Sequence, residues 1–225
     1  MRLRSFLLVA VTLISSATAF GGSDTRFWIG ATGGLSTYSL SDLNDEIRTI
    51  NSLSSLKMNE IKSGLAYGVG AGICVDNKWW LETHYERLNG SSEMGDATGR
   101  LEYHVPANAY FFNAIYTLSS NSPLRIGFCG GVGIVSAAGM ISISITGTGS
   151  ASGDTSGTGP LAQGFLAADI PAGSRVSFCP LAGYRFAKIS KIEVRGETVY
   201  TNDGSKYSME YSGLILRLGI KVFLN

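Results

Sequence analysis

The sequence is short of charge and of histidine, and these shortages argue against several classes of protein. Charged residues make up 16% of the 225 residues, against about 25% in ordinary soluble domains. The net charge is +1, so no excess of positive charge indicates a nucleic-acid partner. The only two histidines, His84 and His104, stand in no pattern of metal ligands. We therefore expect no nucleic acid, no metal and no cofactor.

Cysteine is also scarce. Cys74, Cys129 and Cys179 are three in number, so they cannot all pair within one chain, and no C-x-x-C motif is present. Each lies in an apolar or glycine-rich stretch. We expect three small strand side chains with at most one disulfide, whose partners the sequence does not specify.

The first residues have the three parts of a secretory signal peptide. Arg2 and Arg4 give a positive start, residues 6–14 are apolar apart from one threonine, and Ala17 and Ala19 supply the small residues of a cleavage site. We predict a signal peptide over residues 1–19 and a mature chain over 20–225. A buried N-terminal helix is the alternative.

The mature chain lacks any run of 18 or more apolar residues, so it contains no candidate for a membrane-crossing helix after the signal. An exported chain of this kind either folds in water or inserts as a β-barrel, the other structure that can span a bilayer.

Apolar residues recur instead with a period of two. In residues 65–75 large side chains alternate with glycine and alanine, and in residues 214–224 six aliphatic side chains alternate with a set that includes Arg217 and Lys221. Such alternation predicts strands whose two faces meet different surroundings. Lipid outside and a polar interior would fit this pattern.

Eight such segments are present, and the connections between them alternate short and long. This alternation is typical of an outer-membrane barrel with short periplasmic turns and long external loops, whereas a soluble lipocalin-like barrel has less reason for it. The predicted fold is an all-β, eight-stranded, antiparallel up-and-down transmembrane barrel. Its predicted strands are residues 27–38, 64–76, 79–88, 101–118, 124–146, 161–170, 175–189 and 208–224.

Three of the long loops have a distinct character. The first, residues 39–63, spaces its apolar residues three or four apart and predicts an amphipathic helix of about 15 residues beginning near Ser41. The helix could pack on the barrel rim, cover the mouth, lie on lipid or meet a partner. Residues 147–159 are rich in glycine and serine and predict a flexible linker. Residues 190–207 predict a small hairpin, with residues 191–195 as one arm and a turn at residues 202–204.

Four stretches carry a family resemblance. Residues 105–112 and 124–133, together with residues 80–88 and the closing segment 213–223, resemble the small outer-membrane β-barrel superfamily, which includes opacity-type surface proteins and the OmpA-like transmembrane domain. The resemblance implies an exported barrel of the bacterial cell outer membrane. Members often end in an aromatic residue, whereas here Phe223 is followed by Leu224 and Asn225.

Strand parity predicts which side chains face inward and outward. On the fourth segment we expect Glu102, His104 and Asn108 to face inward. We also expect aromatic side chains at the lipid interfaces, namely Trp79, Trp80, Tyr116 and Tyr184. The predicted interior polar cluster, structural or gating, comprises Glu82, His84, Glu86, Arg125, Arg217 and Lys221.

The expected role is non-catalytic: a surface-exposed structural or adhesion protein that acts through its external loops. A narrow conduit for small solutes or lipids is one alternative. A lipid-modifying enzyme is another, because both histidines have acidic residues nearby, although no G-x-S-x-G motif marks a nucleophile. The expected partners are outer-membrane lipid or lipopolysaccharide, the barrel-assembly machinery, and a host or cell-surface partner.

Overall fold

The computed structural model describes residues 26–53, 56–76, 78–95, 99–118, 124–137, 140–145, 149–201 and 203–224. The predicted signal peptide, residues 1–19, lies outside the described residues. No helix in the described part of the chain is long and apolar enough to cross a membrane.

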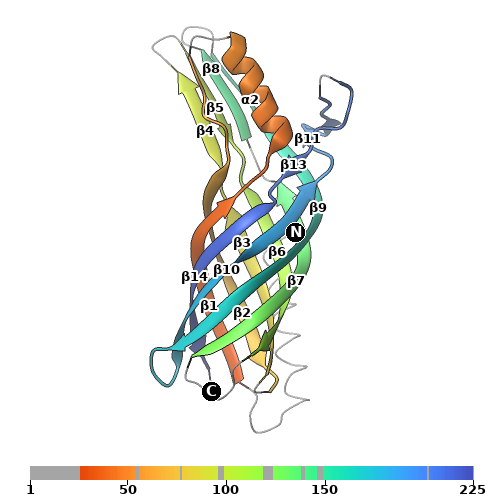
Figure 1. Ribbon diagram of the computed structural model, residues 1–225. Coiled ribbons are helices and arrows are strands. Elements are labelled where there is room, and N and C mark those ends of the chain that lie inside the picture. Colours follow the sequence, from red (N-terminus) through yellow and green to blue (C-terminus); the bar gives the residue numbers. More distant parts are fainter. Residues whose placement is uncertain are drawn as a thin grey trace.

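Eight antiparallel strands close into a barrel (Figure 1). Each strand pairs with the next around the ring, and β14 pairs back with β1, so every barrel strand has two neighbours. This closure confirms the predicted fold and leaves no open sheet edge in the wall. The strands of the ring are β1 (Arg26–Thr37), β2 (Ser63–Cys74), β3 (Trp79–Leu88), β6 (Ala107–Thr117), β7 (Arg125–Ala137), β9 (Gly149–Pro171), β10 (Val176–Ile189) and β14 (Gly213–Phe223).

The period of two in the sequence fixes the two faces of the wall. In β14, Leu216 and Leu218 are exposed on the outside, while Arg217 between them is buried inside. In β2, glycine and alanine face inward and the large side chains face outward. The same alternation in neighbouring strands produces one apolar exterior and one mixed interior.

Short connections join the strands at the lower end of the barrel. Residues 75–78 join β2 to β3 and residues 172–175 join β9 to β10. β14 also ends there, as Figure 1 shows. The third predicted short turn, residues 119–123, lies outside the described residues.

At the other end the sheet continues beyond the ring. β4 (Ser91–Gly95), β5 (Gly99–His104) and β8 (Met140–Ile145) pair with one another and with the first part of β9. The prediction of a flexible linker over residues 147–159 is therefore wrong from residue 149 onward, because β9 begins there. Pairing with β7 and β8 orders a segment whose composition alone favours a coil.

The fourth predicted barrel strand is in fact two strands. A break at Val105 and Pro106 separates β5 from β6, but the odd-numbered residues are buried on both sides of it. The expectation that Glu102, His104 and Asn108 face inward is wrong. Glu102 and His104 alternate with buried Tyr103 and lie on the opposite face of β5, and Asn108 lies on the outer wall, opposite in parity to buried Asn113. Proline cannot donate a ladder hydrogen bond, which accounts for a break at this point.

The external region has its own hydrophobic core. Helix α2 (Ser41–Leu53) buries Leu43 and Ile47 in it, together with Tyr38, Tyr103, Met209 and Tyr211. This outcome matches one of the four predicted positions of the helix, packing against the rim. Buried Asn44 fixes the following loop, because its Nδ2 donates to the carbonyl of Ile61 and its Oδ1 accepts from the amide of Ile61.

The last long loop forms a hairpin, as predicted, but the chain first turns at residues 195–196, before the predicted turn at residues 202–204. β11 (Glu193–Val194) pairs with β12 (Glu197–Thr198), and the turn between them lies at Arg195 and Gly196, both with positive φ. Positive φ at both positions is typical of a type I′ hairpin turn. Tyr200 and Lys206 then form a second bridge around the predicted turn at residues 202–204; residue 202 lies outside the described residues.

Candidate functional site

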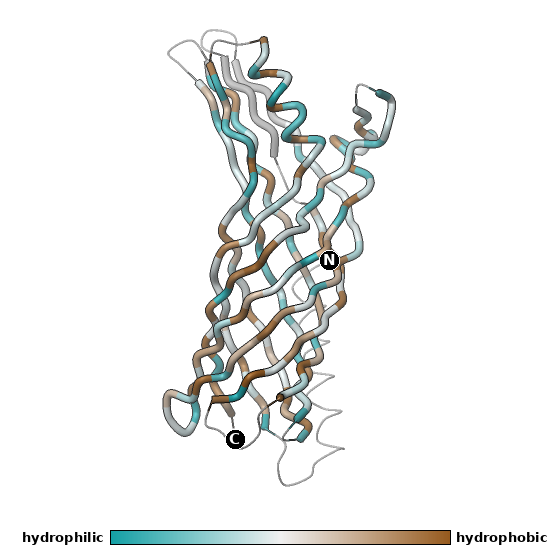
Figure 2. The backbone as a smooth tube through the Cα atoms, viewed as in Figure 1, coloured by the Kyte–Doolittle hydropathy of each residue, from teal (hydrophilic) through white to brown (hydrophobic). Residues whose placement is uncertain are grey.

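An uninterrupted apolar band covers the outside of the barrel. Leu35, Val69, Phe128, Leu166, Phe186 and Leu218 are each 48% exposed or more, although burial of such side chains is the rule in a protein surrounded by water. In Figure 2 hydrophobic residues recur along the strands of the barrel wall. On the described barrel strands, the outward-facing charged side chains nearest the band are Arg87 and Lys188, which lie near the outer ends of their strands. The band is the surface that a bilayer would cover.

Aromatic side chains lie at both ends of this band. Trp79 and Tyr116 face outward near the lower turns, with ring centroids 5.1 Å apart, and Tyr184 faces outward near the outer end. Such positions suit the headgroup zones of a membrane.

Trp80, in contrast, does not lie at the interface. It is only 3% exposed and points into the barrel, because it has the same strand parity as the inward Glu82. There its ring packs edge-on against Phe223, and the guanidinium of Arg125 lies 5.5 Å from the ring centroid. The prediction of an interfacial Trp80 is therefore wrong.

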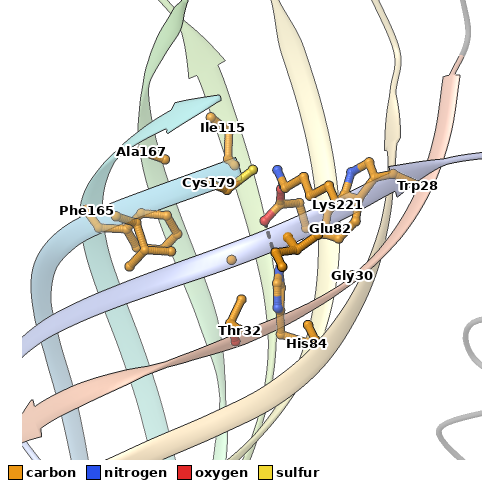
Figure 3. A pocket seen from close by; sticks show the side chains of 14 residues that line it. Trp28, Gly30, Thr32, Glu82, His84, Ile115, Phe165, Ala167, Cys179 and Lys221 are labelled. Carbon is orange, nitrogen blue, oxygen red and sulfur yellow. Dashed lines mark hydrogen bonds and ion pairs between the residues drawn. The ribbon is translucent and has the colours of Figure 1, made fainter. Parts of the chain in front are cut away.

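The lower part of the interior is organised around Glu82 (Figure 3). Lys221 Nζ donates to Glu82 Oε1 at 2.7 Å, and His84 Nε2 lies 2.9 Å from Glu82 Oε2. Lys221 Nζ is also 4.4 Å from the centroid of the Trp28 ring, a cation–π contact. The carboxylate therefore has one cationic and one imidazole partner, which offsets the cost of burying its charge.

Glu86 is the centre of a second layer, further toward the outer end. Its Oε2 accepts from Arg185 Nη2 at 2.6 Å and from Arg217 Nη2 at 3.2 Å. Arg217 also donates to the carbonyl of Leu35 at 2.6 Å and to Ser36 Oγ at 2.8 Å. One carboxylate thus stands between two buried guanidinium groups.

Amides complete this layer. Gln163 Oε1 accepts from Arg185, and Gln163 Nε2 donates to Asn113 Oδ1 at 2.9 Å. Arg185, Gln163 and Asn113 are absent from the predicted cluster. Arg185 alternates with the outward Tyr184 and Phe186, so strand parity alone would have placed it inside.

Of the predicted cluster, the structure places Glu82, His84, Glu86 and Arg217 deep inside the barrel. Lys221 contacts them through its hydrogen bond to Glu82. Arg125 lies near the lower end of the barrel, with its guanidinium over the ring of Trp80. The six residues therefore face one interior, but they belong to two layers and do not converge on one point.

The cavities between these side chains are water-sized. One, of ≈ 20 Å³, is lined by Trp28, Thr32, His84 and Cys179 among others, and a second, of ≈ 30 Å³, lies near Arg125 and Asp169. Trp28 Nε1, Thr32 Oγ1 and His84 Nδ1 are buried and have no hydrogen-bond partner within the part of the chain that the structure describes. A cavity of this size admits about one water molecule, which could satisfy such groups. Above the two layers, Tyr38 and Tyr211 pack with ring centroids 5.6 Å apart and close the outer end.

Glycine makes room for these interior rings, as replacement of Gly70 should show. A Cβ at Gly70 would lie 2.5 Å from Nδ1 of His84, whose ring stacks on Phe111 and is bonded to Glu82. We expect Gly70→Ala to lower the free energy of unfolding by about 1–3 kcal/mol, the usual cost of overpacking. Urea unfolding in detergent micelles measures it.

Gly33→Ala is the matched control. A Cβ at Gly33 meets nothing within 4 Å, and that position faces outward. A loss of stability in Gly33→Ala equal to that in Gly70→Ala would show that β-propensity or backbone entropy, not the His84 ring, causes the effect.

The cysteines and histidines form no reactive centre in the described part of the chain. Cys74, Cys129 and Cys179 are all free and buried. The described residues contain no group of three or more potential metal ligands. Within them, no serine hydroxyl is hydrogen-bonded to a histidine ring: His84 is bonded to Glu82 inside the barrel. A serine nucleophile is activated by a base within hydrogen-bond reach, and an acidic residue orients that base.

These features define a class: an eight-stranded barrel with an apolar exterior, short turns at one end and a side-chain-filled interior is a small outer-membrane-type β-barrel. No family model and no curated protein matches the sequence. Solved structures do match. Neisserial surface protein A is 15% identical, with 87% of this chain and 96% of that chain covered and a TM-score of 0.49. OprG from Pseudomonas aeruginosa is 13% identical, with 92% and 99% covered and a TM-score of 0.44.

The outer-membrane protease OmpT from Escherichia coli also matches, at 8% identity, with 89% of this chain and 96% of that chain covered and a TM-score of 0.38. At these identities the likeness concerns the fold alone.

Proposed function

We propose that the protein is an integral protein of the bacterial outer membrane, non-catalytic, with a structural or adhesive role carried by its external region. The observation that carries this proposal is the contrast between the two surfaces of the barrel wall. The outside is apolar and the inside holds the charges, an arrangement that suits lipid and is unfavourable in water.

The external region supports a contact role, because it is a folded surface. Between α2 and the segment 199–207 lies a groove of ≈ 590 Å³, lined by Asp42, Glu46, Ile50 and Tyr200 among others. Glu46 accepts hydrogen bonds from the hydroxyls of Tyr103 on β5 and of Tyr207 in the last loop, so it connects α2 to both. Burial, together with this carboxylate, raises the pKa of both phenols, so they remain donors at physiological pH.

The membrane location is tested with vesicles. Unfolded protein diluted from urea into phosphatidylcholine vesicles should float with the lipid and migrate differently on a detergent gel before and after boiling. A chain that stays soluble without detergent, sediments apart from the vesicles and shows no gel shift would contradict the proposal.

The adhesive role needs a separate test on cells. Replacing residues 200–206 by a Gly-Ser turn should abolish adherence of expressing cells to collagen-, fibronectin- or mucin-coated surfaces, with the amount of folded protein in the membrane unchanged. Replacing residues 172–174 of a lower turn in the same way is the control, because that turn is on the opposite end of the barrel. Equal adherence of both variants and the parent would argue against a role for this loop.

The interior argues against the conduit. The two charged layers and the outer hydrophobic core fill the barrel along its length, so we expect no steady conductance in a planar bilayer. The lipid-modifying enzyme lacks a serine–histidine–acid constellation in the described residues, as shown above, and no observation of this structure favours it.

A further inference from the structure

Arg87 is an unusual residue of the outer wall. It is the charged side chain of β3 that faces outward, and in the sheet it lies directly opposite Tyr67 on one side and Asn108 on the other. One step further into the apolar band lie Tyr85 and Tyr110, also opposite each other, with ring centroids 5.2 Å apart. Arg87 therefore stands where the apolar band ends.

The side chains around Arg87 are held by hydrogen bonds. Asn108 Oδ1 accepts from Arg87 Nη1 at 2.8 Å and from Tyr85 Oη at 3.0 Å. The guanidinium is therefore positioned beside tyrosine rings before any ligand binds.

No carboxylate of the described residues lies within 4.0 Å of the Arg87 guanidinium. By the same criterion, Arg48 and Arg100 of the external region each have an acidic partner, and so do Arg185 and Arg217 of the interior. Among the residues described, the positive charge of Arg87 at the edge of the apolar surface thus has no counter-ion.

We propose that Arg87, Asn108 and the flanking tyrosines bind the phosphate-bearing headgroup of an outer-leaflet lipid. A guanidinium donates two parallel hydrogen bonds to phosphate oxygens, and tyrosine rings occupy the headgroup zone of membranes. A cation without a protein counter-ion attracts anionic lipid most strongly at this depth. The inference rests on the proposed membrane location and adds a specific lipid contact to it.

Lipid binding to the inserted protein tests the site. Parent protein, Arg87→Gln and Lys188→Gln are first inserted into phosphatidylcholine vesicles, with the gel shift as proof of insertion. Binding of diphosphorylated lipid A is then compared with binding of its dephosphorylated form. Lys188 is the matched control, since it is an exposed outward cation on β10, across the barrel from β3.

We expect the parent and Lys188→Gln to prefer the phosphorylated lipid, and Arg87→Gln to bind it about tenfold more weakly, the factor that corresponds to losing one charge-assisted contact. Arg87→Lys, which keeps the charge but not the planar fork, should fall between them. Millimolar inorganic phosphate should not displace the lipid, because the tyrosines contact the headgroup and not a free anion.

Other outcomes overturn the site. Equal binding by Arg87→Gln and the parent, equal loss in Lys188→Gln, or no preference for phosphate would do so while the membrane location stands. Displacement by inorganic phosphate would identify a general anion site. Failure of the parent to insert would overturn the site and the proposed function together.

Discussion

Glu86→Ala should lower the free energy of unfolding by about 3–5 kcal/mol, the usual cost of leaving a buried charge without its partner. The reason is the position of this carboxylate between Arg185 and Arg217, whose side chains are 1% and 0% exposed. Among the described residues Glu86 is the only acidic partner of either arginine, so both would lose it at once. Urea unfolding of the refolded protein in micelles, followed by the gel shift, measures the change.

Glu93→Gln is the control for the loss of an ion pair as such. Glu93 pairs with Arg100 in the external region, where both side chains are more than half exposed, and exposed pairs contribute about 0–1 kcal/mol. Arg217→Met adds a second comparison, because it leaves the Glu86–Arg185 pair in place and should cost less than Glu86→Ala. Equal, small losses in Glu86→Ala and Glu93→Gln would show that water reaches the interior and screens the charges.

The barrel could be predicted because its wall depends on local alternation. In β2 and β14 successive side chains point to opposite faces of the sheet. Once one face meets lipid, strand parity therefore specifies which residues lie on each surface. The external strands could not be predicted in this way. Residues 149–160 contain mostly glycine, serine and threonine, and they become a strand through pairing with β7 and β8, which lie elsewhere in the sequence.

The interior cluster, too, could be predicted from the sequence only in part. Glu82 and Glu86 face inward by parity, but which cation each one meets depends on the curvature and register of the closed ring. Glu82 pairs with Lys221, whereas Glu86 pairs with Arg185 and Arg217. The misplacement of Trp80 has a different origin: its position near a turn favoured the interface, while its parity with Glu82 already required the interior.

Leu218→Arg should destabilise the inserted protein by about 2–4 kcal/mol, the cost of a cation on the lipid face at the bilayer midplane. Leu218 faces outward in the middle of β14 and is 57% exposed to the surroundings of the barrel. Unfolding from phosphatidylcholine vesicles, with the folded fraction read from the gel shift, gives the difference from the parent.

Leu214→Arg makes the experiment decisive. Leu214 is 63% exposed, so in water the two arginines would be equally solvated and both substitutions should be close to neutral. In a bilayer they differ, because Leu214 lies opposite Tyr184 at the outer edge of the apolar band, where an arginine costs only about 0–1 kcal/mol. The two leucines thus have similar exposed fractions and differ in their depth in the bilayer. A large loss for Leu218→Arg with a small one for Leu214→Arg requires hydrocarbon around the middle of the barrel, whereas two small and equal effects would mean that water surrounds it.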